Sequence, residues 1–329
     1  MSTLRQDPTT RQWVILAPKR ETRPHAPTSI VRPVPSANDP NCPFCPGNET
    51  QTPTEVLRLP EVGPWSVRVV PNLYAPISGD GAAPRTGEPM LREMPAVGAS
   101  EVVIESPSHS ARMDGMSTQD VGRIVTAWRD RFRTLMERAD TRAVVIFKNF
   151  GTLAGTSLTH PHSQIVAAPV FLPRLLRRMD VARAHFDAHG TNLYLDIVKT
   201  ERAAGERIVA ERGRFVAMEP WAASTPYETW LLPTQPQGSI GELRDEDVAD
   251  FAALLGDTLR AIREECGDPD YNLVVSSAPR DGQTSEYFLW HIKILPKIAQ
   301  PAGFEIGSGM GINTVSPEDA AERLRDALE

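Results

Sequence analysis

The chain has 329 residues, of which 40% are hydrophobic, enough for one large core or two ordinary ones. Its formal net charge is −7 at pH 7, so we expect no general affinity for nucleic acid or for an anionic membrane surface. The polar N-terminus does not resemble a signal peptide, and no apolar run approaches the ~20 residues that a bilayer span needs. These features predict a cytoplasmic protein that meets any anionic ligand with a local cluster.

The segment from residue 18 to 107 is rich in proline and should form short strands joined by long loops. Within it, two residues separate Cys42 from Cys45, a spacing that lets two thiolates bind one zinc ion. A reducing compartment disfavours disulfides, so we interpret the pair as metal ligands. Two further ligands are needed, and the candidates are His109 and one histidine of the pair His160 and His162. Two reduced cysteines in a surface loop are the alternative.

Apolar residues recur at helical spacing after Ser117, up to residue 138, and again from about residue 245 to 265. A third helix is predicted at the C-terminus, with Ser316 as N-cap and Pro317 at the first helical position. Short apolar and β-branched runs bounded by Pro, Gly or Asn predict strands. These strands cover residues 101–105, 143–148, 163–168, 227–232, 272–277 and 291–295.

The predicted elements repeat at an offset within a few residues of 127. The repeat is marked by the pairs Pro107 and Pro233, Asp120 and Asp247, and His162 and His291. Each unit runs strand, helix, strand, loop, strand, which suits an α+β domain with a mostly antiparallel sheet and a helix on one face. Two such sheets could pair into one continuous surface. We place the domains at residues 1–172 and 173–329.

His160, His162 and Gln164 alternate along an extended segment, so their side chains should share one face. A metal that fixed His160 would leave His162 as an imidazole held by an anchored neighbour. Imidazole is largely neutral near pH 7, and it can attack phosphorus and then leave again. The preceding loop, residues 149–157, offers glycines, amides and hydroxyls that can approach a phosphate. Two core or metal-binding histidines without catalysis are the alternative.

Three motifs resemble those of the galactose-1-phosphate uridylyltransferase family, the transferase branch of the histidine triad superfamily. They are H-P-H-S-Q at 160–164, C-P-F-C-P-G-N-E at 42–49 and E-S-P-S-H at 105–109. The likeness runs over nearly the whole chain. It implies tandem histidine-triad-like domains, each with an antiparallel sheet and packed helices. It also implies a ping-pong enzyme in which a histidine carries a nucleotidyl group from a nucleotide sugar to a sugar phosphate, and a homodimer.

By position in these motifs, the resemblance implies that His162 is the nucleophile and that Gln164 hydrogen-bonds the transferred phosphoryl group. It implies one structural zinc site, with the ligands Cys42, Cys45, His109 and His160. It places near the nucleotide Arg20, Arg23, Asn72, Asn149, Gly155 and Ser157. Hydrolases of the superfamily commonly have a third histidine at the position of Gln164. Glutamine cannot protonate a leaving group, so this residue favours transfer over hydrolysis.

The expected reaction is the transfer of UMP from UDP-glucose to a hexose 1-phosphate such as galactose 1-phosphate. Ser163 replaces the glycine of the galactose enzymes. H-S-Q at 162–164 together with N-L-Y at 72–74 also resembles family members that transfer adenylyl groups, such as ADP-glucose phosphorylase. Adenylyl transfer from ADP-glucose or a dinucleoside polyphosphate is therefore the close alternative. A histidine triad hydrolase is a third, and a zinc-stabilised binding protein without turnover is a fourth.

Some family members hold a second metal through additional histidines in the C-terminal half. Ser276 and Leu289 stand at what look like two of those places, so we expect no second site of that type. By the internal repeat, His291 and Lys293 match His162 and Gln164 and are candidates for the sugar-phosphate pocket. An interior histidine and a solvated lysine are the alternatives. Phe304, Glu305 and Asn313 are further candidates because they lie in the region of the family's acceptor loop.

Overall fold

The computed structural model describes residues 1–20, 35–279 and 284–329. The large sheet contains β3 (Leu57–Leu59), β4 (Val67–Pro71), β5 (Ala99–Ile104), β6 (Ala143–Phe150), β7 (His162–Ala168), β8 (Ile208–Arg212), β9 (Phe215–Met218), β10 (Thr229–Pro233), β11 (Tyr271–Ser276) and β12 (His291–Pro296). A small sheet contains β1 (Thr3–Gln6), β2 (Trp13–Leu16) and β13 (Ile312–Asn313). The helices are α1 (Thr118–Met136), α2 (Pro173–His189), α3 (Leu193–Ala204), α4 (Asp245–Cys266), α5 (Thr284–Tyr287), α6 (Gly303–Ser308) and α7 (Pro317–Asp326).

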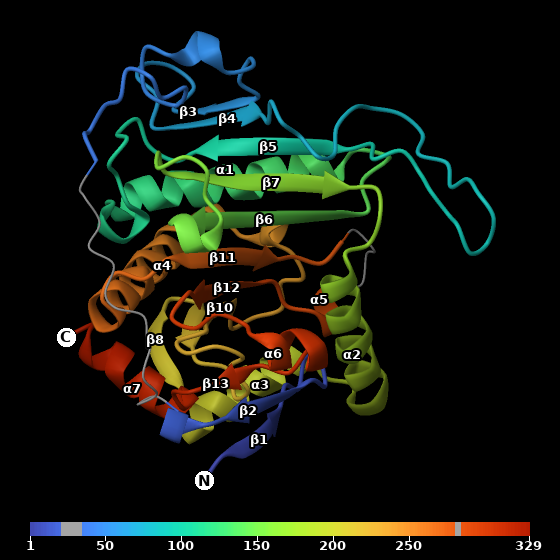
Figure 1. Ribbon diagram of the computed structural model, residues 1–329, viewed down its shortest axis with the longest axis vertical. Helices are drawn as coiled ribbons and strands as arrows, with labels where there is room; N and C mark the ends of the chain where they lie inside the picture. Colours follow the sequence, from blue (N-terminus) through green and yellow to red (C-terminus); the bar gives the residue numbers. More distant parts are fainter. Residues whose placement is uncertain (21–34, 280–283) are drawn as a thin grey trace.

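The large sheet runs β3-β4-β5-β7-β6-β11-β12-β10-β9-β8, and each neighbouring pair is antiparallel (Figure 1). The order β5-β7-β6 in the first half mirrors β10-β12-β11 in the second, and β6 pairs with β11 at the centre. This arrangement confirms an α+β fold in which the repeated units share one continuous sheet. The domain boundary at residues 172 and 173 falls just before α2 and stays a prediction.

The predicted helices and strands are all present, and their caps explain where two of the helices begin. Ser117 accepts a hydrogen bond from the amide of Asp120 at the start of α1, and Ser316 accepts one from the amide of Asp319 at the start of α7. Each cap satisfies a backbone N–H that has no partner inside the helix. The sequence patterns did not predict α2 and α3. Three of the 17 residues of α2 are buried, so its apolar stripe is narrow.

Helices α1 and α4 cover one face of the large sheet (Figure 1). Ile146, Ile165, Leu273 and Ile292, one from each of the four central strands, pack with both helices in one buried core. Because side chains alternate along a strand, the neighbours of these residues project to the opposite face. That face, which we call the ligand face, therefore carries His162 and Gln164.

Different elements cover the two ends of the ligand face. In the first half, the loop around Cys42 and Phe44 packs on Val102 and Ile104 of β5. In the second half, α2 and α3 pack on β9 and β10 with a larger apolar cluster. Between these covers, alternate residues of β6 and β11 are only half-buried. The centre of the ligand face is thus more open than the parts of that face that lie under the two covers.

Replacing Trp128 with phenylalanine tests the contact between α1 and β7. The Trp128 indole Nε1 donates to Ser163 Oγ at 2.8 Å, and both residues are buried. The change leaves the hydroxyl without its donor, so we expect Trp128→Phe to lower the free energy of unfolding by about 1–3 kcal/mol. Urea denaturation measures the effect. Trp13→Phe, at a side chain that is 47% exposed, should change stability little.

Candidate active site and metal cluster

Four side chains from three distant parts of the chain form one buried cluster. Cys42, Cys45, His109 and His160 each offer a donor atom, and these atoms lie within 4.8 Å of one another. Cys45 Sγ is 3.5 Å from His109 Nδ1 and 3.6 Å from His160 Nδ1. Tetrahedral zinc with bonds of about 2.0–2.3 Å holds its ligand atoms roughly 3.3–3.8 Å apart. The cluster can therefore hold a metal ion and is compatible with zinc.

The Nε2 atoms of the two cluster histidines, which face away from the cluster, also have hydrogen-bond partners. His109 Nε2 lies 2.8 Å from Thr159 Oγ1, and His160 Nε2 donates to the carbonyl of Ser106 at 2.8 Å. A carbonyl can only accept, so the proton of His160 is on Nε2, and Nδ1 keeps its lone pair toward the cluster. Burial lowers the pKa of His160 to about 4. The ring is thus neutral at pH 7, as metal binding requires.

His162 opens β7, two residues beyond His160, and its imidazole is 7% exposed. Its Nδ1 lies 2.9 Å from the carbonyl of His160. Because that oxygen can only accept, Nδ1 carries the proton and Nε2 keeps a free lone pair. Burial lowers the pKa of His162, so the neutral form dominates at pH 7. The backbone of the metal-ligand candidate therefore fixes the tautomer that a nucleophile needs.

An aromatic side chain from the cysteine loop helps to place this ring. Phe44 lies between Cys42 and Cys45, and its ring meets the His162 ring edge-on with the centroids 5.6 Å apart. It meets the His160 ring in the same way at 5.9 Å. The loop thus contributes ligand atoms to the cluster and a packing surface to His162, so the two parts of the site are physically joined.

Gln164 lies in an in-register row that crosses the ligand face. From one side of the sheet to the other, the row contains Val102, Gln164, Phe147, Val274, Lys293, Trp230 and Met218. Three strand spacings separate Gln164 from Lys293, which is about 14 Å. A ligand on the half-buried centre of the sheet can therefore touch residues from both repeats.

The loop between β6 and β7 is held by an acid from the second repeat. Gly151 has φ +85°, and the Asp270 carboxylate lies against it and accepts a hydrogen bond from the amide of Leu153 at 2.5 Å. Asn272 donates to the Asn149 side chain at 2.8 Å and to the carbonyl of Ala154 at 2.9 Å. The sequence patterns did not predict this role for Asp270 and Asn272. The internal repeat does match β11, which contains Asn272 and directly follows Asp270, to β6.

Other predicted nucleotide residues are spread around this centre. Gly155 and Ser157 are exposed on the same loop, at the end of β7 where His162 lies. Asn72 directly follows β4, and its side chain accepts from the amide of Tyr74 at 2.9 Å. Arg20 is exposed at the end of the short 3-10 helix Pro18–Arg20, which follows β2. Arg20 thus follows a strand of the small sheet, whereas His162 and Gln164 lie on β7 of the large sheet. Arg23 lies outside the described residues.

His291 makes the same hydrogen bond from its ring to the backbone as His162, but its ring is enclosed by other side chains. Its Nδ1 lies 3.0 Å from the carbonyl of Leu289, again two residues earlier. The ring is stacked on Tyr194 and Trp230, with centroids 5.2 Å away in each case, and is completely buried. Burial lowers its pKa well below the ordinary value. This closure favours the interior-histidine interpretation over direct contact with a sugar phosphate.

The remaining candidates for the sugar-phosphate pocket differ in their exposure to solvent. Burial lowers the pKa of Lys293 to about 7, and its ammonium lies 3.9 Å from the centroid of the Trp230 ring. Phe304 is exposed on α6, and Glu305 caps the same helix by accepting from the amide of Ala302. Asn313 is buried, and its amide bonds three backbone groups, at Ala223, Thr225 and Val315. That environment indicates a structural amide and counts against a sugar-phosphate contact at Asn313.

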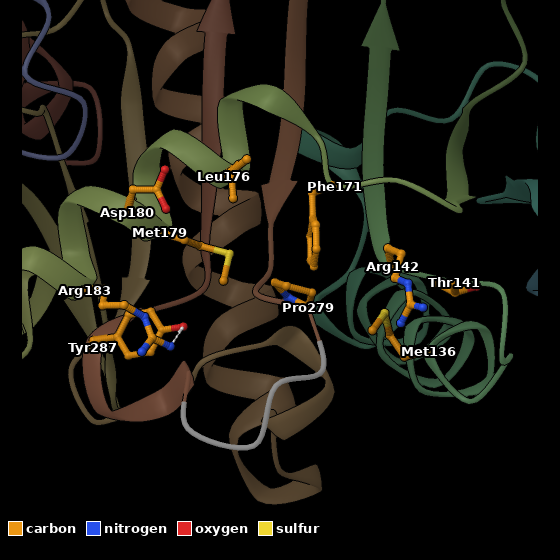
Figure 2. A pocket seen from close by; sticks show the side chains of 10 residues that line it. All are labelled: Met136, Thr141, Arg142, Phe171, Leu176, Met179, Asp180, Arg183, Pro279 and Tyr287. Carbon is orange, nitrogen blue, oxygen red and sulfur yellow. Dashed lines mark hydrogen bonds between the residues drawn. The ribbon is translucent and has the colours of Figure 1, made fainter. Parts of the chain in front are cut away.

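Figure 2 shows a pocket of about 230 Å³ that is separate from His162. Phe171, Leu176 and Met179 point into it from the segment after β7 and from α2, and Arg142 faces them from the start of β6. Arg142 and Phe171 flank the ends of β6 and β7 that are opposite to His162. The metal cluster and the glycine loop have no part in its lining.

Metal content provides a direct test of the cluster. We expect one bound metal ion per wild-type chain by elemental analysis after dialysis, and close to none in Cys45→Ala, because three ligands hold a metal far more weakly. Cys266→Ala is the matched control, since Cys266 lies on α4 and is not a member of the cluster. Equal metal in Cys45→Ala and wild type would contradict the assignment.

Two alanine substitutions in the β6–β7 loop separate strain from steric conflict. Gly151 and Gly155 have nearly the same positive φ, +85° and +88°. A Cβ at position 151 would meet the Asp270 carboxylate, whereas one at position 155 meets nothing within 4 Å. We expect Gly151→Ala to lose about 1–3 kcal/mol more free energy of unfolding than Gly155→Ala. Parallel denaturant titrations measure the difference, and equal losses would exclude a tight Asp270 contact.

No helix within the described residues is both long and apolar enough to cross a membrane. Comparison with curated proteins finds ADP-glucose phosphorylase of Arabidopsis thaliana, 33% identical over 98% of this chain and 92% of that protein. It also finds galactose-1-phosphate uridylyltransferase of Haemophilus influenzae, 31% identical over 99% of this chain and 94% of that protein. Both similarities span the two repeats.

Among solved structures, an ADP-glucose phosphorylase from Arabidopsis thaliana with bound ADP-glucose matches with a TM-score of 0.85 and 31% identity, over 99% of this chain and 98% of that one. A uridylyltransferase structure matches with a TM-score of 0.77 and 29% identity, over 100% and 98%. Residues 1–171 match the family model of the galactose-1-phosphate uridyl transferase N-terminal domain, and residues 178–328 match that of its C-terminal domain. The chain therefore belongs to the galactose-1-phosphate uridyl transferase family.

Proposed function

We propose that this protein transfers UMP from UDP-glucose to a hexose 1-phosphate, such as galactose 1-phosphate, through a covalent intermediate on His162. The observation that carries the proposal is the hydrogen bond from His162 Nδ1 to the carbonyl of His160, which leaves Nε2 as the free nucleophilic nitrogen. Membership of the family supports the same class of chemistry.

The reaction takes place in two displacements. In the first, the Nε2 lone pair attacks the α-phosphorus of the nucleotide sugar. A P–N bond forms, the bond from that phosphorus to the bridging oxygen breaks, and the sugar 1-phosphate leaves with the electron pair. In the second, a phosphate oxygen of the incoming sugar phosphate attacks the same phosphorus, and the P–N bond breaks. No net proton transfer is needed if both sugar phosphates have the same protonation state.

Neighbouring groups support transfer rather than hydrolysis. Gln164 lies two residues beyond His162 on the same face of β7, where its amide can donate to a phosphoryl oxygen. Ser157 is exposed on the β6–β7 loop, where its hydroxyl can be a further donor, and Asp270 holds that loop in shape. A glutamine supplies no acidic proton to activate water or a leaving group. We therefore rank a histidine triad hydrolase below both transferases.

Adenylyl transfer is the second candidate function. The similarity to ADP-glucose phosphorylase, by sequence and by fold, supports an enzyme that takes AMP from ADP-glucose or a dinucleoside polyphosphate and passes it to phosphate or a sugar phosphate. The chemistry at His162 is the same, so the two candidates differ in the base pocket and the acceptor.

We also propose that Zn²⁺ fills the cluster of Cys42, Cys45, His109 and His160, because two thiolates and two imidazoles are a donor set typical of structural zinc. When bound, the metal supplies rigidity: it holds His160, whose carbonyl orients His162. The family resemblance further supports a homodimer, nucleotide-sugar and sugar-phosphate partners, and a cytoplasmic location. The absence of a second metal site in the C-terminal half stays a prediction.

Intact-mass analysis tests the function and distinguishes the two candidates. Wild-type protein is incubated separately with UDP-glucose and ADP-glucose, without an acceptor. We expect an adduct with the mass of one uridylyl group, or one adenylyl group for the alternative, because the trapped intermediate carries its nucleotide. His162→Ala should form neither adduct.

The acceptor provides the matching control. Adding galactose 1-phosphate to the uridylylated protein should remove the adduct and release UDP-galactose. For an adenylyl phosphorylase, inorganic phosphate should instead remove the adenylyl adduct and release ADP. A wild-type chain that gains no nucleotide mass from either sugar nucleotide would contradict both transferase functions. Loss of the adduct to water at a rate independent of acceptor would favour the hydrolase.

A further inference from the structure

A buried ion pair lies directly behind the nucleophile. Lys148 is on β6 and Glu105 follows β5, and β7, which begins with His162, runs between these two strands. Lys148 Nζ lies 2.5 Å from Glu105 Oε2, and both side chains are almost completely inaccessible to solvent. The alternation of side chains along β5 and β6 puts the pair on the helix side of the sheet, opposite the His162 ring.

The pair also binds the backbone that carries the ring. Lys148 Nζ donates to the carbonyl of His162 at 3.2 Å, and the amide of Glu105 donates to the carbonyl of Pro161 at 3.1 Å. The ring of His162 itself holds the carbonyl of His160. Three successive carbonyls are therefore fixed from different directions, two of them by the residues of the ion pair. The peptide planes on both sides of His162 cannot rotate without breaking one of these bonds.

The second repeat shows that the fold does not need charges here. Phe147 pairs with Gln164 as Val274 pairs with Lys293, so Val275 is the counterpart of Lys148. Counting along β5 and β10 in the same way makes Pro233 the counterpart of Glu105. Val275 is buried in the main core, and His291 keeps its ring geometry without an ion pair.

Burying two charges is costly, and apolar residues of similar size are often at least as stable. The ion pair is present only in the repeat that carries the nucleophile. His291 is sandwiched between aromatic rings, which hold it in place. No such sandwich surrounds His162 among the described residues, and the ring must remain in position while phosphorus is bonded to it and then released.

We propose that Lys148, held by Glu105, is a positioning residue that fixes the His162 backbone during nucleotidyl transfer. Lys148 does not touch the phosphoryl group, because it lies on the other side of the strand. The inference rests on the proposed covalent chemistry at His162 and adds the device that keeps the nucleophile aligned.

The test removes both charges at once, so that neither is left buried alone. The double variant Lys148→Met, Glu105→Gln should form the nucleotidyl adduct about 100-fold more slowly in single-turnover experiments, because small misplacements of a reacting group are that costly. The concentration of nucleotide sugar that gives half the maximal rate and the bound metal should not change. Lys148→Arg keeps a donor near the carbonyl and should recover part of the rate.

A second buried pair on the same strand gives a matched control. Arg131 of α1 binds Glu101 of β5 through two hydrogen bonds, of 2.8 and 2.6 Å. The double variant Arg131→Met, Glu101→Gln removes a largely buried pair whose hydrogen bonds do not involve residues 160–162, and it should form the adduct at the wild-type rate. An equal loss in both double variants would overturn the proposal, because it would indicate general destabilisation.

Chemical rescue with free imidazole separates a positioning role of Lys148 from its other possible effects. In His162→Gly supplied with free imidazole, the attacking ring no longer depends on the backbone. Adding Lys148→Met, Glu105→Gln to that variant should leave the imidazole-dependent rate unchanged, and a further loss there would overturn the proposal. Should the charge-free pair fail to fold, Lys148→Gln, whose shorter amide withdraws from the His162 carbonyl, gives the same comparison.

The outcomes distinguish this inference from the function on which it rests. A wild-type protein that never gains nucleotide mass overturns the proposed function, and the positioning role falls with it. A wild-type protein and a charge-free double variant that gain the nucleotide at the same rate overturn the positioning role alone.

Discussion

The hydrogen bond between the His162 ring and the carbonyl of His160 is the contact on which the site depends. It decides which ring nitrogen carries the proton, and it ties the orientation of His162 to a residue whose own ring faces the metal cluster. Any movement of the His160 backbone therefore moves the ring of His162, the proposed nucleophile. The loop with Cys42, Phe44 and Cys45 thus belongs to the active site although it lies more than 100 residues earlier in the chain.

The two repeats have kept their geometry and diverged in environment. Both place an imidazole at the start of a central strand, with its Nδ1 bonded to the carbonyl two residues before. In the first half the loop around Cys42 and Phe44 leaves the centre of the ligand face half-buried, and an ion pair lies behind the strand and bonds its first carbonyl. In the second half α2 and α3 cover the face, and aromatic rings enclose His291. The first repeat thus has the proposed nucleophile beside an open part of the sheet, and the second encloses His291 in packing.

Because the two repeats share one sheet, both can contribute residues to one ligand site. Because β6 and β11 pair at the centre, residues of both halves lie within one ligand length of each other, and the row from Gln164 to Lys293 spans about 14 Å. Residues of the second half also support the first, since Asp270 and Asn272 hold the β6–β7 loop. Neither repeat could present the site alone.

The sequence by itself determined the repeat, the central strands, the helices α1, α4 and α7 and the pair Cys42 and Cys45, because each depends on local periodicity or on ligand spacing. The family resemblance added His109 and His160 to that pair. Residue spacing could not reveal that Asp270 holds the glycine loop, that Lys148 reaches the His162 carbonyl, or that His291 and Asn313 are enclosed. These contacts join residues that are far apart in the chain, so only the pairing of strands and the packing of α2 and α3 decided them. Local patterns specify which side chains can do chemistry, and burial and neighbours decide which of them are free to do it.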